Sequence, residues 1–212
     1  MRIVNHQLSP DDTGGIEVLP LSRWGKVKSI WRPTITPTII VIHYAVTSSL
    51  DALVRSQLAT GYFAHLSIDG FSDGKRSVMR VVQQLPFNKR GAHAGESEWN
   101  GRKRCNGFSI GIEIANPGPL VNGRTVYGQV WDPKDAVETG PIPGYPKQWT
   151  WWARYSNEEM AILASVCRAL RVEYPSITEI VGHSDVAPGR KFDPGPAFPL
   201  SWLRQAVFDG AQ

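Results

Sequence analysis

The sequence predicts an α/β fold in which helices flank a central mixed β-sheet. Residues 38–43 form a short β-branched run after Pro37, which is typical of a buried strand. Apolar residues follow at helical spacing between Leu50 and Leu58. Residues 109–115 alternate isoleucine with small or polar residues, as a half-buried strand does. Strands that alternate with helices along a chain are typical of a sheet covered by helices.

The first helix is expected to begin at Ser48. Its hydroxyl can cap a helix, and Asp51 follows three positions later, as in a capping box. Gly61 suits the end of this helix, because glycine readily adopts the left-handed conformation found there. Two short strands are expected next, at 65–69 and 78–83.

The strand at 109–115 should present two different faces. Successive strand side chains point to opposite sides of a sheet, so the isoleucines share one face. The other face carries Ser109, Gly111, Glu113 and Ala115. Glu113 is therefore a lone carboxylate on a face of small residues, and that face has room for something above it.

Residues from about 117 to 155 are rich in Pro, Gly and Trp, and we expect a long ordered loop or insertion there. A helix should follow, because Ser156 and Glu159 have the spacing of a capping box. A further strand is expected at 179–183, and a last helix near 201–208.

Length and composition fit a single domain over residues 1–212. Hydrophobic residues make up 42% and charged residues 20%, which excludes a disordered tail, a collagen and a small disulfide scaffold. Cys105 and Cys167 are expected to be free thiols. The longest apolar run, 39–42, is far shorter than the ~20 residues of a membrane span. Residues 1–10 lack the apolar core of a secretion signal, so synthesis in the cytoplasm without a signal peptide is expected.

The net charge of +4 can attract a polyanion such as nucleic acid, anionic lipid or a bacterial wall polymer. The basic cluster at 101–104 is short and is not interleaved with aromatic residues, as it would be in a protein that binds single strands. We therefore expect no nucleic-acid partner. Nothing in the sequence indicates an oligomer, and a monomer is expected.

Two histidines and an aspartate could form a metal site. His43 and His183 each end a predicted strand, and Asp193 follows ten positions after the second histidine. Two imidazoles and a carboxylate can hold Zn²⁺ and leave a fourth position open for water. Beside such an ion Glu113 would be a natural general base, and Lys191 could stabilise an oxyanion. Without a metal, the histidines would cap strands by hydrogen bonding, and the other groups would be structural or surface charges.

Five ordered motifs resemble those of the type-2 zinc N-acetylmuramoyl-L-alanine amidases, which share their fold with the peptidoglycan recognition proteins. The motifs are His43-Tyr-Ala, Ala64-His65, Gly91-Ala-His-Ala-Gly95, Asn106 with Ser109-Ile-Gly-Ile-Glu113, and the segment from Gly182 to Phe198. The resemblance runs from about Ile3 to about Leu203. It implies hydrolysis of the amide that joins N-acetylmuramic acid to L-alanine in peptidoglycan or muropeptides.

The resemblance also implies roles for individual residues. His43, His183 and Asp193 match the zinc ligands of the family, Glu113 its catalytic glutamate, and Lys191 the lysine that helps to hold the oxyanion.

Other residues match the substrate groove of the family. His93 and Asn106 are expected to bind substrate. Ala92 replaces a tryptophan of the family motif, and Trp99 could supply the missing aromatic contact to a sugar. His65 is expected to be structural.

Other classes and settings compete with this interpretation. A non-catalytic peptidoglycan-binding module would not need the complete set of site residues, and a general zinc protease would be expected to carry HExxH. The basic charge, the insertion and the opening segment 3–8 favour a cell-wall lysin, an endolysin with bacteriolytic activity. The alternative is an intracellular recycling amidase that acts on anhydro-muropeptides.

Overall fold

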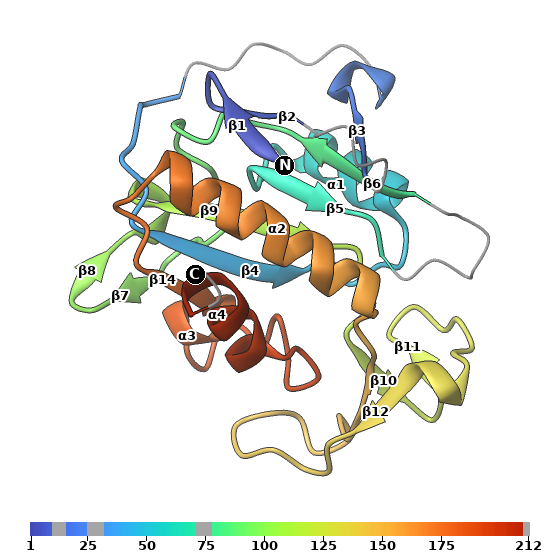
Figure 1. Ribbon diagram of the computed structural model, residues 1–212. Helices are drawn as coiled ribbons and strands as arrows, with labels where there is room; N and C mark the ends of the chain where they lie inside the picture. The colour runs from blue at the N-terminus through green and yellow to red at the C-terminus, as the bar shows by residue number, and fades with distance from the viewer. Residues whose placement is uncertain (10–15, 25–31, 71–77, 210–212) are drawn as a thin grey trace.

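The structure is a computed structural model that describes residues 1–9, 16–24, 32–70 and 78–209. Its central sheet has six strands: β3 (Ile16–Leu19), β4 (Ile39–Tyr44), β5 (Leu66–Ile68), β6 (Met79–Gln83), β9 (Ser109–Ile114) and β14 (Glu179–Gly182). Their order across the sheet is β14-β4-β9-β5-β6-β3 (Figure 1). Strands β14, β4, β9 and β5 are parallel, and β6 is antiparallel to β5. The predicted mixed sheet is confirmed.

Helices cover both faces of this sheet (Figure 1). Helices α2 (Asn157–Glu173) and α4 (Leu200–Phe208) cover the face on which Ile40, Ile112 and Leu163 form part of the main core. Helix α1 (Leu50–Thr60) lies on the opposite face, where Val54 packs with Val82 of β6. The flanking helices of the predicted fold class are therefore present.

Helix capping agrees with the sequence at α2 and differs by one residue at α1. Ser156 and Glu159 form the predicted capping box, in which each side chain accepts a hydrogen bond from the other residue's backbone N–H. At α1 the capping residue is Ser49 and not Ser48, because the Ser49 hydroxyl accepts the N–H of Ala52. The glycine at position 61 ends the helix as predicted, at φ 72°.

The strand predicted at 179–183 ends one residue early. Strand β14 stops at Gly182, and His183 begins the short helix α3 (His183–Val186). The Asp185 carboxylate accepts the N–H of Gly182 at 2.8 Å, which caps this turn at its start. A helical turn therefore holds His183 directly at the end of the sheet.

For the segment at about 117–155 the sequence left a loop or an insertion open. The loop is wrong, because this segment forms a four-stranded antiparallel sheet in the order β11-β10-β13-β12. Its strands are β10 (Pro119–Val121), β11 (Arg124–Thr125), β12 (Ala136–Glu138) and β13 (Trp151–Ala153), and we call it the insertion sheet. Such short strands show no periodicity. Asn122 and Gly123 both have positive φ, as the tight turn between β10 and β11 requires. Leu120, Trp131 and Ala136 are among the residues of its small core.

Two hairpins were not predicted. Strands β1 (Arg2–Val4) and β2 (Gln7–Ser9) pair at the N-terminus, and β7 (Glu98–Trp99) pairs with β8 (Arg102–Lys103). Contacts with distant residues stabilise the first hairpin, since the backbone N–H of Leu8 donates to the Gln83 side chain at 2.6 Å. A segment of two or three residues is too short for a pattern in the sequence to indicate it.

Short 3-10 helices complete the described elements, at η1 (Leu21–Trp24), η2 (Cys105–Gly107) and η3 (Pro133–Asp135). Both cysteines are free, as expected, and both are buried. None of the described helices has the length and apolar character that a bilayer span requires.

Candidate active site

The chemically active side chains meet at the carboxyl ends of neighbouring parallel strands. In the register of β4 and β9, His43 lies directly opposite Glu113, so both side chains leave the same face of the sheet. Strand β14 borders β4 on its other side, and His183 follows it immediately. The carboxyl edge of a parallel sheet is a common place for a ligand site, because loops from several strands converge there.

Three potential metal ligands converge at this edge. The Nδ1 atoms of His43 and His183 are 2.9 Å apart, and Asp193 Oδ2 lies 2.9 Å from the first and 3.0 Å from the second. All three residues are buried. Ligand atoms ~2.0–2.2 Å from a tetrahedral zinc ion would be on the order of 3.3 Å apart. The donor set and its spacing therefore fit a divalent metal such as zinc.

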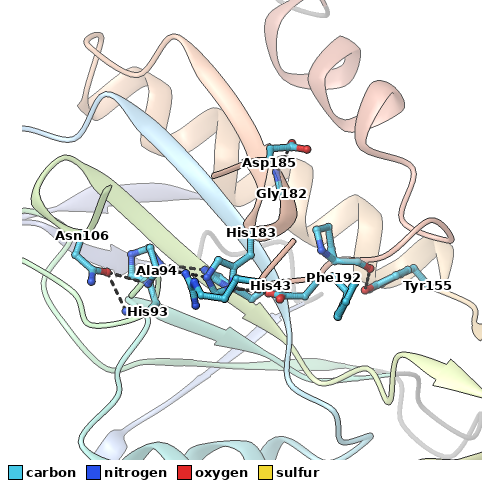
Figure 2. Close-up of polar contacts among 12 residues, drawn as sticks. His43, His93, Ala94, Asn106, Tyr155, Gly182, His183, Asp185 and Phe192 are labelled. Atoms are coloured by element: carbon cyan, nitrogen blue, oxygen red, sulfur yellow. Dashed lines mark hydrogen bonds and ion pairs between the residues drawn. The ribbon is translucent and has the colours of Figure 1, made fainter. Parts of the chain in front are cut away.

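Hydrogen bonds behind the histidines orient both rings, as Figure 2 shows. With each Nδ1 directed toward the other ligands, each Nε2 carries the proton, an assignment made from the hydrogen-bond network. The Nε2–H of His183 donates to the Ala94 carbonyl at 3.2 Å, and the Nε2–H of His43 donates to Nδ1 of His93 at 3.0 Å. Such partners fix the ring orientation and tautomer of metal-binding histidines.

His93 fills the space that the sequence predicts above the small residues of β9. A Cβ atom added to Gly111 would lie 2.4 Å from the His93 ring. The Nε2–H of His93 donates to the hydroxyl of Ser109 at 3.3 Å. Asn106 Oδ1 accepts the backbone N–H groups of His93 and Ala94, both at 2.9 Å. Glycine at position 111 thus lets the imidazole approach the sheet closely enough to reach His43.

One cavity of about 920 Å³ brings most of the predicted site residues together. Its lining includes the three potential ligands together with Glu113, Lys191, His93 and Asn106. Trp99 lies elsewhere: its indole N–H donates to the Glu179 carboxylate, and its ring packs beside the core at the other end of the sheet. The expected sugar contact by Trp99 is therefore not supported. Substrate contact by His93 and Asn106 stays a prediction.

Glu113 differs from an ordinary carboxylate. Its Oε2 atom is buried and has no hydrogen-bond partner within the described part of the chain. Burial above all, and then the negative charge of Asp193, raise the pKa of Glu113 to about 8, although the positive charge of Lys191 acts in the opposite direction. A half-buried carboxyl group that lines a cavity and has one buried oxygen without a partner is suited to proton transfer.

The electrostatics of the ligands also suit a metal. Burial and the neighbouring His183 lower the pKa of His43 to about 4, so its imidazole is neutral at pH 7. Burial alone would raise the pKa of Asp193, but the close approach of the two histidines outweighs burial and lowers this pKa below its usual range. A neutral imidazole and an ionised carboxylate are the forms that bind zinc.

His65 has the structural role that the sequence predicts. It is fully buried, its Nε2–H donates to the Lys89 carbonyl at 2.6 Å, and its Nδ1 accepts the backbone N–H of Gly111 at 3.0 Å. Both ring nitrogens are used inside the fold.

Sequence reasoning missed two tyrosines in the cavity lining, Tyr44 and Tyr62. Tyr62 is 71% exposed and contributes to the same cavity as Ala92, the residue that replaces the family's tryptophan. No periodicity marks an aromatic residue in a short connection, because the same sequence could cover the core or face a ligand.

Comparison with known proteins agrees with this geometry. Residues 33–196 match the family model described as N-acetylmuramoyl-L-alanine amidase, Amidase_2. The chain belongs to this type-2 amidase family. The family is the one that the five motifs indicated, so the predicted enzyme class is confirmed.

Relatives within the family are similar over most of the chain. The 1,6-anhydro-N-acetylmuramyl-L-alanine amidase AmpD of Escherichia coli is 33% identical over 186 residues, which are 81% of this chain and 82% of that protein. The AmpD of Enterobacter cloacae is 38% identical over 179 residues, 78% of each chain. The expectation of an endolysin is not supported, since these amidase relatives are named for anhydro-muramyl substrates.

A solved structure of the family is also similar. It is a complex of the Escherichia coli N-acetylmuramyl-L-alanine amidase AmiD with the substrate anhydro-N-acetylmuramic acid-L-Ala-D-gamma-Glu-L-Lys. The TM-score is 0.59 at 25% identity, over 84% of this chain and 60% of that chain. The amidase fold predicted for the chain is confirmed.

Proposed function

We propose that the chain hydrolyses the amide between N-acetylmuramic acid and L-alanine in muropeptides, with a zinc ion held by His43, His183 and Asp193. One observation carries the proposal: three ligand atoms of buried residues converge within 4.8 Å of one another, in the same cavity as Glu113, whose Oε2 atom is buried and has no partner among the described residues. A module that only bound peptidoglycan would have no use for a carboxylate in this state.

The protein groups divide the acid–base work. Zinc, when bound, supplies a Lewis acid and lowers the pKa of its water from ~15.7 toward ~7. Glu113 takes a proton from the attacking water and returns it to the leaving nitrogen of L-alanine. The Lys191 ammonium stabilises the negative charge that develops on the substrate carbonyl oxygen. The positive charge of Lys191 opposes the rise in the pKa of Glu113, and a bound cation would lower this pKa further, which favours the ionised base.

The substrate we propose is a soluble anhydro-muropeptide. The chain would then be the intracellular recycling amidase that the sequence left as the alternative to a lysin. The names of the AmpD relatives and the substrate in the AmiD complex support it. The cavity of about 920 Å³ is in the usual range of ~300–1,000 Å³ for a small ligand. The insertion favoured a cell-wall lysin in the sequence, but the described residues that line this cavity all lie outside 117–155.

Mass spectrometry of the products tests the proposal. The zinc-loaded protein is incubated with an anhydro-muropeptide, with its reducing-end counterpart and with intact sacculi, and Glu113→Gln is the matched inactive control. We expect free stem peptides that begin with L-alanine, formed fastest from the anhydro-muropeptide. New reducing sugar ends would identify a glycosidase. Faster release of stem peptides from sacculi than from the anhydro-muropeptide would favour a cell-wall lysin instead.

A further inference from the structure

An aromatic cluster joins the insertion sheet to the loop that carries Lys191 and Asp193. We call Tyr145, Trp149 and Trp152 the aromatic support. The ring of Phe192 lies 4.9 Å from that of Tyr145 and 5.2 Å from that of Trp149, measured between centroids. The Tyr145 hydroxyl also donates to the Phe192 carbonyl at 3.3 Å. Phe192, which lies between Lys191 and Asp193, is thus held by both its ring and its backbone.

Trp152 fixes the same loop on the other side of Asp193. It is 1% exposed, and a Cβ atom added to Gly195 would lie 2.7 Å from its ring. Tyr145 and Trp149 each contact Trp152 edge to face, with centroids 5.8 Å apart. The aromatic support is therefore one connected unit that contacts the loop at Phe192 and at Gly195.

Contacts of this kind matter because a metal site depends on the placement of its ligands. The Asp193 backbone continues directly from Phe192 into Pro194, whose carbonyl accepts the Tyr155 hydroxyl at 2.8 Å. Loss of the residues that hold a ligand in place typically lowers metal affinity or activity ~10–100-fold. The insertion therefore contacts the loop that carries Asp193, and it contributes no described residue to the cavity lining.

We propose that Tyr145 and Trp149 are positioning residues, which hold Asp193 for zinc binding and Lys191 for oxyanion stabilisation. The part of the proposal that concerns the reaction rests on the proposed function, whereas zinc affinity tests the positioning independently. Both side chains are only half-buried, so their truncation can be tolerated by the fold.

The test compares Tyr145→Ala, Trp149→Ala and the double variant with Trp151→Ala as matched control. Trp151 belongs to the same sheet but is 41% exposed, and it lines a different cavity with Trp131 and Leu120. The zinc dissociation constant is measured by competition with a chromophoric chelator, the folding of the metal-free proteins by circular dichroism, and kcat and KM on an anhydro-muropeptide.

We expect the dissociation constant of the double variant to rise ~10–100-fold and kcat to fall, with KM within about twofold of the wild type. Trp151→Ala should bind zinc normally, and Tyr145→Phe and Trp149→Phe should restore most of the affinity because they keep the rings. If the metal-free double variant does not fold, the zinc dissociation constants of Tyr145→Ala and Trp149→Ala test the proposal instead.

The proposal is overturned if the Tyr145 and Trp149 variants bind zinc as tightly as the wild type, or if Trp151→Ala weakens binding equally. If the alanine variants of Tyr145 and Trp149 bind zinc more weakly than the wild type and Trp151→Ala does not, the positioning role stands. If none of these proteins, the wild type included, cleaves a muropeptide, the proposed function fails.

Discussion

Glu113 combines a half-buried position, a raised pKa and a buried carboxylate oxygen that has no partner among the described residues, and it lies beside His43 on the neighbouring strand. We predict that Glu113→Gln lowers kcat ~10²–10⁴-fold, the usual effect of losing a general base. The variant should bind zinc as the wild type does, because the carboxylate is not among the converging ligands. Steady-state kinetics and metal analysis on the same sample check both points. Loss of zinc from the variant would make Glu113 a ligand.

Tyr62 is the exposed aromatic residue of the cavity lining, and the family's tryptophan is absent at Ala92. We predict that Tyr62→Ala raises KM for an anhydro-muropeptide ~2–10-fold and leaves kcat nearly unchanged, because an aromatic contact contributes ~0.5–1.5 kcal/mol. Tyr62→Trp should restore binding. Tyr127→Ala is a suitable control, since Tyr127 is 49% exposed and lies in the insertion. An unchanged KM in Tyr62→Ala would exclude this contact.

The side chains of the site were easier to predict than their partners. The ordered motifs indicated His43, His183 and Asp193, and alternation along 109–115 placed Glu113 on its own face. No pattern in the sequence indicates the hydrogen bonds that orient the two histidine rings. His43 reaches His93 across 50 positions and His183 reaches Ala94 across 89, so these pairs depend on how the strands and loops pack.

At the scale of elements, the capping box of α2 contains an unusual carboxyl group. Glu159 is fully buried, its Oε1 has no partner among the described residues, and burial raises its pKa to about 8. In the unfolded chain the pKa of this glutamate is near 4.5. The folded protein therefore keeps the Glu159 proton up to a higher pH than the unfolded chain does. The contribution of Glu159 to the free energy of unfolding falls as pH rises from about 4.5 to about 8.

We predict that Glu159→Gln removes the fall in stability between about pH 4.5 and about pH 8. The amide side chain keeps an oxygen that accepts the Ser156 N–H, and it never ionises. The variant and the metal-free wild type should have similar stability at pH 5, and the variant should be more stable at pH 9, by on the order of 1–3 kcal/mol. Urea unfolding at both pH values measures the difference. Ser156→Ala is the control, with a loss of ~1 kcal/mol at either pH. Equal wild-type and Glu159→Gln stabilities at pH 9 would contradict the prediction.

Elements with a regular pattern were predicted and very short ones were not. Strand β9 alternates over six residues and α2 repeats its apolar positions over 17. The insertion sheet has strands of two or three residues, and pairing with one another and packing around Trp131 stabilise them. The dipeptide Asn122-Gly123 was the local signal for its first hairpin, because both residues adopt the positive φ of a tight turn.

At the scale of the whole molecule, a bound metal would join segments that are far apart in the sequence. His43 lies on β4, and His183 and Asp193 lie 140 and 150 positions later. An ion that binds only the folded chain stabilises it by ~2.7 kcal/mol at a hundred times the dissociation constant.

We therefore predict that chelation lowers the Tm of the protein and that added zinc restores it. Asp193→Asn should show neither response, and calorimetry with and without chelator compares the two proteins. The same Tm for the wild type under both conditions would mean that no such ion is bound. Gel filtration of these samples also checks the expected monomer of 23.5 kDa.

The hydrogen-bonded chain behind His43 ends at a group that does not take up protons. It runs through His93 to the Ser109 hydroxyl, which donates to the Cys105 carbonyl at 2.6 Å. A peptide carbonyl accepts a hydrogen bond but does not take up a proton at ordinary pH. Among the described residues, a proton on His43 therefore cannot pass beyond Ser109 along this path, and exchange with solvent takes place on the cavity side, which His93 also lines. During turnover we therefore expect protons to move on the cavity side, which Glu113 also lines.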